Sequence, residues 1–154
     1  MVSIVFSESI ILISSIILAT AFTGIILSKT GTLESMVSSA TSMQRSNILT
    51  DIKIIYVTNT TSSTVVAWVK NVGKQPIVDI DAVDIYFGPI KSVNMIPYNN
   101  GGSPTWIYED TSTWDIMETK KIIISYGSSL SNTTYMLSIA TPNGITDEYI
   151  FSPP

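Results

Sequence analysis

Cysteine and histidine are both absent from the 154 residues of this sequence. Histidine is the commonest general base, and imidazole and thiolate groups are the usual ligands of zinc, haem iron and iron–sulfur clusters. The two absences exclude disulfides, these metal centres and the nucleophilic systems that depend on either residue. Serine and threonine are abundant, but no histidine is present to activate them. We therefore predict a protein that is not an enzyme and that holds no cofactor or metal.

Charged residues are also scarce, at 13% of the chain, which is about half the usual share in soluble domains. Eight lysine and arginine residues stand against twelve aspartate and glutamate residues, for a formal net charge of −4. Binding to nucleic acid depends largely on basic residues that neutralise phosphates. The composition therefore excludes a nucleic-acid partner.

Residues 9–28 form a segment of twenty positions without a charge, most of which are apolar. Twenty helical residues span about 30 Å, the thickness of the hydrocarbon core of a bilayer. A cleaved signal peptide would carry basic residues before its apolar stretch, and none precedes this one. We predict a retained membrane-spanning helix, with a signal peptide and a buried core helix as the alternatives.

Two features bear on the orientation of this helix. Lys29 is the one basic residue near its ends, and taken alone it weakly favours a cytoplasmic C-terminal side. Two N-glycosylation sequons, which begin at Asn59 and Asn132, make sense only outside the cytoplasm, although two could arise by chance in a chain rich in threonine. We predict a single-pass protein of the cell membrane whose C-terminal domain lies outside, with Asn59 and Asn132 as glycan acceptors.

The apolar helix also offers positions for contacts between subunits. Glu8 either lies at the membrane interface near the positive end of the helix dipole or pairs with the free amino terminus of a neighbouring subunit. Small residues permit close helix approach in membranes, although membrane helices often contain them for other reasons. The positions that we assign to membrane insertion and assembly are Glu8, Ile10, Ile13, Ile17 and Gly24.

Helical spacing continues beyond the apolar segment. One narrow apolar stripe recurs every three or four residues, and it consists of Leu33, Met36, Val37, Ala40 and Met43. Such a stripe fits a seam against a partner helix or a contact with the following domain, and Gly31 could kink or interrupt the helix. We predict a first domain over residues 1–50.

The apolar pattern changes to alternation from residue 51 onward, which predicts β-strands. Short runs rich in β-branched and aromatic residues cover 51–58, 63–70, 76–87, 90–96, 105–108, 119–126, 135–141 and 145–151. Seven or eight short strands at this spacing predict an immunoglobulin-like all-β sandwich over residues 51–154. Trp68 is expected in its core.

Two groups of side chains in this domain could carry chemistry. Asp79, Asp81 and Asp84 have the wrong spacing for a calcium loop, so we interpret them as the solvated face of an edge strand. Carboxylates also surround three aromatic residues, which could bind a glycan or a protein partner or simply belong to the core and its loops. These candidate partner contacts are Trp106, Tyr108 and Trp114.

Several of these features together resemble a known family. The start Met1-Val2-Ser3, Glu8 before a smooth apolar helix, a continuing helix rich in serine and threonine, and a sandwich are similar to the FlaG/FlaF family of type IV pilin-like archaellum accessory proteins. The phrase at 66–73, Val-Ala-Trp-Val-Lys-Asn-Val-Gly, resembles a strand and turn of that family and of archaellins. No Lys/Arg-Gly processing site precedes the helix, which counts against a secreted major filament subunit unless the sequence is that of an already processed chain.

The resemblance implies a membrane-anchored stationary component of the archaellum that self-assembles and that binds a FlaF-like protein and, through it, the S-layer. An archaellin or pilus subunit is the nearest alternative. A membrane-tethered adhesin or glycan-binding module is an alternative of another class.

Overall fold

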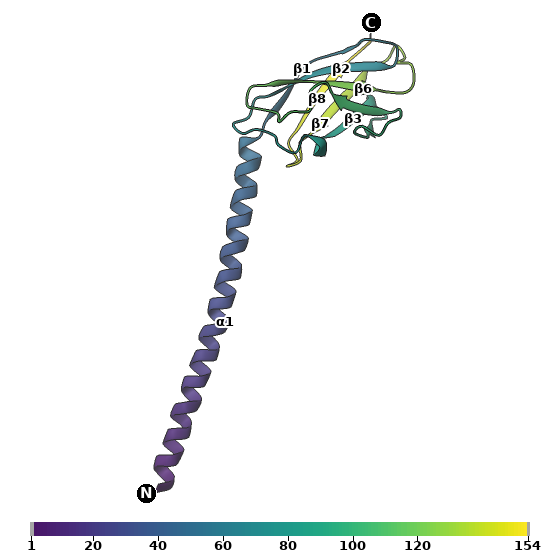
Figure 1. The fold of residues 1–154 in the computed structure, drawn as a ribbon. Helices are drawn as coiled ribbons and strands as arrows, with labels where there is room; N and C mark the ends of the chain where they lie inside the picture. The colour runs from purple at the N-terminus through teal and green to yellow at the C-terminus, as the bar shows by residue number, and fades with distance from the viewer. Residues whose placement is uncertain (1, 154) are drawn as a thin grey trace. The chain divides into compact units, whose positions relative to one another are not determined.

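The computed structural model describes residues 2–153, and the chain divides into two compact units (Figure 1). In the first unit, Met1–Ser42, residues 2–42 are helical. The second unit, Met43–Pro154, contains the last turns of the same helix and all of the β-strands.

Helix α1 spans Val2–Leu49 and continues through Gly31, so this glycine does not interrupt it. Its large apolar side chains between Phe6 and Leu27 are each 50–75% exposed in the isolated chain. By length and composition, this is a helix that could cross a membrane. The predicted long N-terminal apolar helix is therefore confirmed.

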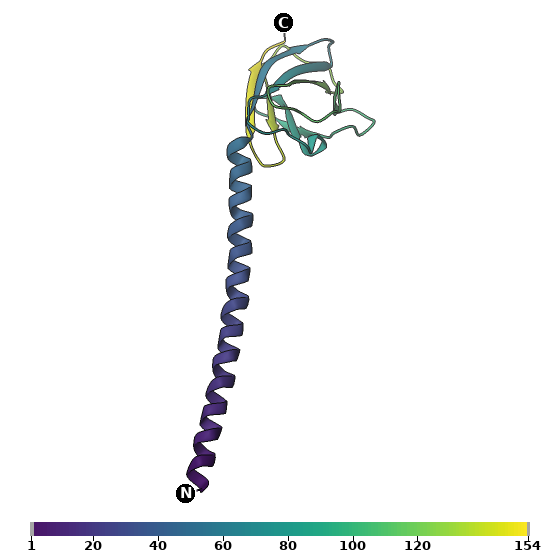
Figure 2. The same ribbon diagram turned by 60° about the vertical axis from the view of Figure 1, so that its left-hand side comes forward.

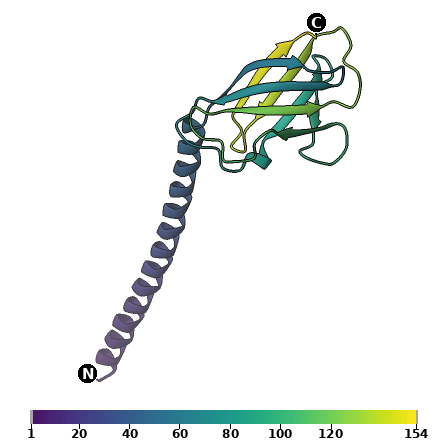
Figure 3. The same ribbon diagram turned by 45° about the horizontal axis from the view of Figure 1, so that its top comes forward.

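Eight strands form two antiparallel sheets that face each other in a sandwich (Figure 2). The first sheet has the order β1-β2-β6-β5, in which β1, β2 and β6 lie side by side in Figure 3, and the second has the order β4-β3-β7-β8. The bounds are β1 Ile52–Asn59, β2 Thr64–Asn71, β3 Asp84–Pro89, β4 Asn94–Ile96, β5 Thr105–Tyr108, β6 Thr119–Ser125, β7 Tyr135–Ala140 and β8 Thr146–Phe151. This architecture confirms the predicted helix followed by a sandwich.

Alternating residues of the inner strands build the core. In β2, Val65, Ala67 and Val69 are fully buried, because every second side chain of a strand points to the same face of the sheet. From the second sheet, Phe87 stacks on Tyr135 with ring centroids 5.4 Å apart.

The edges of the two sheets are joined to each other on both sides. On one side, Asp147 of β8 accepts hydrogen bonds from the backbone amide of Ile54, at 2.7 Å, and from the Lys53 ammonium, at 2.6 Å. On the other side, Trp106 of β5 exchanges backbone hydrogen bonds with Pro97 and Asn99 of the segment after β4. These links occupy backbone groups that would otherwise be free to pair with another chain.

Two predicted strands are shorter than expected. Residues 76–87 contain an isolated bridge at Ile77, a 3₁₀ helix, η1 (Ile80–Ala82), and only then β3. The chain crosses here from one sheet to the other, so its apolar residues reach the core from a loop. In the predicted strand 90–96, only Asn94–Ile96 is a strand, because Ser92 donates a 2.7 Å hydrogen bond to Pro89 and closes a turn.

Two smaller expectations about the strands were wrong, one about the acidic residues before β3 and one about Trp68. Asp79 and Asp81 do not lie on a strand, since Asp79 precedes η1 and Asp81 lies within it. Trp68 is half-buried on the outer face of β2 rather than in the core, and it contacts Tyr56 of β1 with ring centroids 5.7 Å apart.

Candidate functional site

The end of helix α1 is fastened to the turn that follows β2, and both elements belong to the second unit. The last carbonyl groups of a helix have no partner within the helix and need donors from elsewhere. Here the backbone amide of Lys74 donates to the Leu49 carbonyl at 2.7 Å. Two residues later, the Asp51 carbonyl accepts from the amides of Val72 and Gly73, each at 3.0 Å.

Asn71 holds this turn in place from inside the sandwich. Its side chain is fully buried, and its Oδ1 accepts the Gly73 amide at 3.0 Å. Its Nδ2 donates to the carbonyls of Gln75, at 3.0 Å, and Trp114, at 3.2 Å. All of its amide groups are thus used, as a buried polar side chain requires.

Gly73 is required because the backbone approaches too closely for any side chain. A Cβ at this position would lie 2.6 Å from the Leu49 oxygen and 2.6 Å from the Asp51 nitrogen, both of which are backbone atoms. The Lys-Asn-Val-Gly phrase that carried the family resemblance therefore forms the seat of the helix end.

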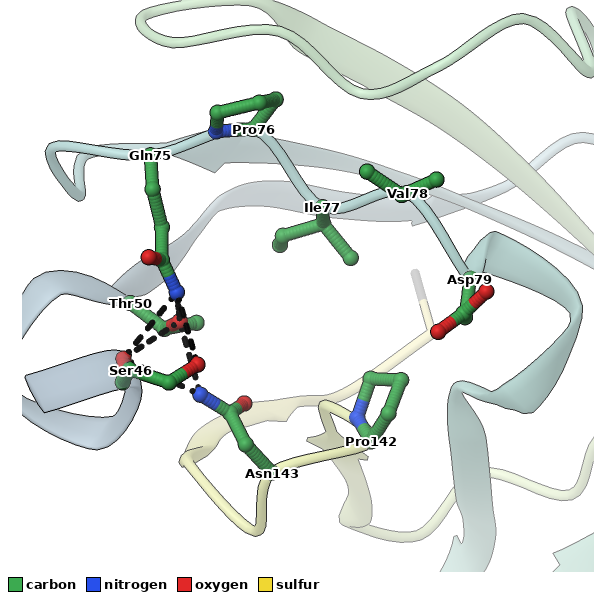
Figure 4. Close-up of a pocket in the computed structure, with 9 residues that line it drawn as sticks. All are labelled: Ser46, Thr50, Gln75, Pro76, Ile77, Val78, Asp79, Pro142 and Asn143. Atoms are coloured by element: carbon green, nitrogen blue, oxygen red, sulfur yellow. Dashed lines mark hydrogen bonds between the residues drawn. The ribbon is translucent and has the colours of Figure 1, made fainter. Parts of the chain in front are cut away.

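Two side-chain amides that lie far apart in the sequence complete the attachment (Figure 4). Gln75 Nε2, after β2, and Asn143 Nδ2, in the β7–β8 turn, each donate to Thr50 Oγ1 at 2.7 Å. Both amides also reach the Ser46 carbonyl, at 3.1 and 3.2 Å. We call Ser46, Thr50, Gln75 and Asn143 the helix-end clamp.

The clamp connects one helix to both sheets. Thr50 is 6% exposed, and its hydroxyl donates to the Ser46 carbonyl while it accepts from the two amides. The amides are neutral donors at the negative end of the helix dipole, so the attachment does not depend on ionised groups. Its hydrogen bonds therefore do not depend on the protonation state of the clamp side chains.

A cavity of about 340 Å³ adjoins the clamp. Its wall consists of Ser46, Thr50, Gln75, Pro76, Ile77, Val78, Asp79, Pro142 and Asn143. Among these residues Asp79 is the one ionisable group, so general acid–base catalysis by a pair of groups has no basis here. Among residues 2–153, no three carboxylates lie close enough together to hold a metal.

Lys120 is the second buried polar feature of the sandwich. Its ammonium lies 2.9 Å from Glu118, 3.0 Å from Asp110 and 2.7 Å from the hydroxyl of Ser112. Burial disfavours the charged amine, but the bonds to Glu118 and Asp110 outweigh it and raise the pKa of Lys120. The amine therefore stays protonated and is not a nucleophile.

The two carboxyl groups respond in the opposite direction. The hydrogen bond from the Ser112 hydroxyl, helped by the Ser112 amide and by Lys120, lowers the pKa of Asp110 to about 2. The hydrogen bond from Lys120 lowers the pKa of Glu118. This network fixes the segment between β5 and β6, which carries Trp114.

The predicted partner contacts Trp106, Tyr108 and Trp114 lie in the core, at 1%, 4% and 0% exposure. The Tyr108 hydroxyl donates to the Ile80 carbonyl at 3.1 Å, and burial raises its pKa. Trp114 pairs with Ile77 and accepts from Asn71, so it supports the helix seat. These rings therefore offer no exposed face on this fold to a glycan or a protein.

The predicted assembly positions of the helix are exposed in the first unit. Ile10, Ile13 and Ile17 are 61%, 57% and 62% exposed, and a Cβ added at Gly24 would meet nothing within 4 Å. Glu8 is exposed as well. Their roles in insertion and assembly remain predictions.

Sequence reasoning missed the clamp and the lysine network. Gln75 and Asn143 are separated by 67 intervening residues in the chain, and neither has a local pattern that indicates its partner. The Lys-Asn-Val-Gly phrase was the one available signal, because an asparagine two residues before a glycine is typical of a side chain that bonds its own turn.

The sequence matches the archaeal-type flagellin family over residues 3–151, and the chain therefore belongs to this family. In structure it is similar to the archaellum periplasmic stator protein FlaG from Sulfolobus acidocaldarius, at 41% identity and a TM-score of 0.64. That match covers 67% of this chain and 100% of the other.

A complex of the periplasmic stator proteins FlaF and FlaG from the same organism also matches, at 41% identity and a TM-score of 0.63. This second match covers 67% of this chain and 90% of the other. No curated protein sequence matches. The matches confirm the resemblance to FlaG and support a structural component of the archaellum.

Proposed function

We propose that this chain is a membrane-anchored structural part of the archaellum stator, whose sandwich lies outside the cytoplasm and binds a FlaF-type partner. The observation that carries the proposal is the presence, in one chain, of an exposed apolar helix and a sandwich that matches a periplasmic stator protein over its full length. Within the second unit, the helix-end clamp ties the last turns of helix α1 to both sheets of the sandwich.

The chemistry of the helix supports insertion into a bilayer. Hydroxyl groups within the apolar segment donate to carbonyls one turn earlier, as Ser14 does to Ile10 at 2.7 Å and Thr23 to Ala19 at 2.8 Å. Polar groups in hydrocarbon need such internal partners. Exposed apolar side chains favour lipid over water by about 25 cal/mol per Å².

The outer face of the first sheet is the surface that we assign to a protein partner. Ile55 and Tyr56 of β1 are each 52% exposed, and Ile107 of β5 is 40% exposed. Trp68 and Ile123 lie on the same face, between them. Apolar surface of this kind on a soluble domain is typical of a protein interface. The partners we propose for it are a FlaF-type protein first, with a second copy of the chain and the S-layer as further candidates.

Fractionation of native cells tests the anchor, and binding tests the partner. We expect the full chain in membranes, released by detergent, and captured by a FlaF-type protein from the same organism. Ile107→Lys should weaken the capture, whereas Val78→Lys, at an exposed position in the connection between β2 and β3, should not. Recovery of the chain in the aqueous fraction, or equal capture of both variants, would contradict the proposal.

The match to archaeal-type flagellins supports a second candidate, a subunit of the filament itself. The two candidates differ in where the protein accumulates. A filament subunit would be abundant in sheared filaments, whereas a stator component would stay with the cell envelope after shearing.

A further inference from the structure

The two sequons of the chain lie in different structural settings. The first begins at Asn59, the last residue of β1, and the second begins at Asn132, in the connection between β6 and β7. A sequon is a substrate for glycan transfer when its asparagine is on an accessible surface loop. The settings therefore distinguish the two asparagines as acceptors.

Asn132 has the setting of an acceptor. Its side chain is exposed, and no hydrogen bond to it is found in the part of the chain that the structure describes. The amide of Thr133 donates to the Ser131 carbonyl at 2.7 Å, which places Asn132 at the apex of a tight turn. Ser131 is fixed in turn by the hydroxyl of Tyr135, a core residue, whose oxygen accepts its amide at 2.9 Å.

Asn59 has the opposite setting. It is part of the β1–β2 ladder opposite Val65, and its Oδ1 is buried without a hydrogen-bond partner. The hydroxyl of Thr61, the third residue of that sequon, accepts the Ser63 amide within the hairpin. Presenting this asparagine to a transferase would require opening the end of the ladder.

We propose that Asn132 carries an N-linked glycan and that Asn59 does not. The inference rests on the placement of the sandwich outside the cytoplasm under the proposed function. In the transfer, Asn132 Nδ2 forms a bond to the anomeric carbon of a sugar carried on a lipid phosphate. The bond from that carbon to the phosphate oxygen breaks, the lipid phosphate leaves, and the amide nitrogen loses one proton to a base of the transferase.

The position of Asn132 gives the glycan a definite place on the sandwich. β7 separates it from Asn143 of the helix-end clamp, and six strand residues extend about 20 Å. The glycan would thus lie at the end of the sandwich away from the helix attachment. It would leave the clamp free and shield the loops of the far end.

Mass spectrometry of the full chain from its native membranes tests the proposal. We expect a mass above the 16.8 kDa of the polypeptide and a modified peptide that contains Asn132. Asn132→Gln should return the chain to the polypeptide mass, whereas Asn59→Gln should keep the added mass. Thr134→Ser, which preserves the sequon and the hydroxyl that accepts from Ser152, should also keep it.

A cysteine variant separates failure of this inference from failure of the proposed placement. The chain has no cysteine, so Ser129→Cys, in the same exposed connection, provides a single site for a membrane-impermeant maleimide on intact cells. Labelling from outside together with an unmodified wild-type chain would overturn the glycan and leave the placement standing. Protection of the cysteine until the cells are opened would overturn both. Added mass that persists in Asn132→Gln, or that is lost in Asn59→Gln, would overturn the assignment to Asn132.

Discussion

The two units of this chain use apolar residues in opposite ways. Ile17 of the helix is 62% exposed, and Ile124 of β6 is fully buried. In the sandwich, burial of such side chains stabilises the fold within a single chain. In the helix, hydrogen bonds within the backbone already satisfy the main chain, so its apolar side chains have to find lipid or another helix. The same residue type therefore serves folding in one unit and localisation in the other.

The largest expected difference between the units comes from truncating these two isoleucines. Ile124→Ala should lower the free energy of unfolding of the sandwich by about 4 kcal/mol, because it leaves a cavity in a packed core. Ile17→Ala should change it by less than about 0.5 kcal/mol. All three tryptophans lie in the sandwich, so denaturant titration of detergent-solubilised chain, followed by tryptophan fluorescence, measures this unit alone. Similar losses in both variants would contradict the comparison.

A charge in the middle of the helix should impair membrane insertion without changing the stability of the sandwich. Ile17→Arg should disfavour membrane insertion by about 3 kcal/mol, the cost of an arginine at the centre of a spanning helix. The fluorescence-monitored unfolding of the sandwich should stay unchanged. Carbonate extraction of membranes measures insertion, and Glu34→Arg, outside the apolar segment, is the matched control. Equal membrane retention of both variants would argue against a spanning helix.

The junction between the regions should be sensitive to a single methyl group. Gly73→Ala should destabilise the sandwich by about 2 kcal/mol, because its Cβ would overlap two backbone atoms and force the helix seat apart. Gly102→Ala is the control, since a Cβ there meets only the Asn100 side chain, at 3.9 Å. Equal unfolding midpoints for the two variants would show that the seat does not need the close approach.

The clamp hydroxyl should contribute less. Thr50→Val keeps the shape of the side chain but removes the acceptor that Gln75 and Asn143 share, at a cost of about 1 kcal/mol. Thr50→Ser retains the hydroxyl and should lie closer to the wild type. Denaturant titration of the two variants tests the clamp. If packing of the methyl group mattered more than the shared acceptor, Thr50→Ser would be less stable than Thr50→Val, which would contradict this prediction.

The smallest effect at neutral pH should come from the lysine network. Lys120→Met should stay within about 1 kcal/mol of the wild type at pH 7, because it removes the buried charge and leaves carboxylates that water can reach, the side chains of Asp110 and Glu118 being 65% and 32% exposed. Its effect should appear in acid. The pKa values of Asp110 and Glu118 are lowered in the folded state, so the stability they contribute is present above about pH 4 and is lost as the pH falls towards 2.

Thermal midpoints measured between pH 7 and pH 2.5 test this expectation. The fall in midpoint should be smaller in Lys120→Met, since Glu118 then loses the bond that lowers its pKa. It should not vanish, because Ser112 still lowers the pKa of Asp110. Parallel curves for the variant and the wild type would contradict a role of Lys120 in the acid response.

Predictions from the sequence succeeded where the alternation of apolar and polar residues along one segment determines its structure. The alternation in 63–70 and 135–141 gave strands within one residue of β2 and β7, because the core face of a strand repeats every second residue. They failed in 76–87, where the chain passes between sheets and Ile77 and Ile80 reach the core without a ladder. Trp68 failed for a related reason, because a large aromatic side chain can be placed on either face.

The sequence by itself determined that an apolar helix precedes an all-β domain, since length, absence of charge and hydrophobic period depend on neighbouring residues alone. It also determined that neither thiolate nor imidazole chemistry is available. Only the tertiary structure decided that Asn71 and Gly73 seat the helix end, that Gln75 and Asn143 meet at Thr50, and that Trp106 and Trp114 are buried. These outcomes depend on residues that the packing of two sheets brings together. The hydrophobic pattern of one segment does not specify which other segment it will pack against.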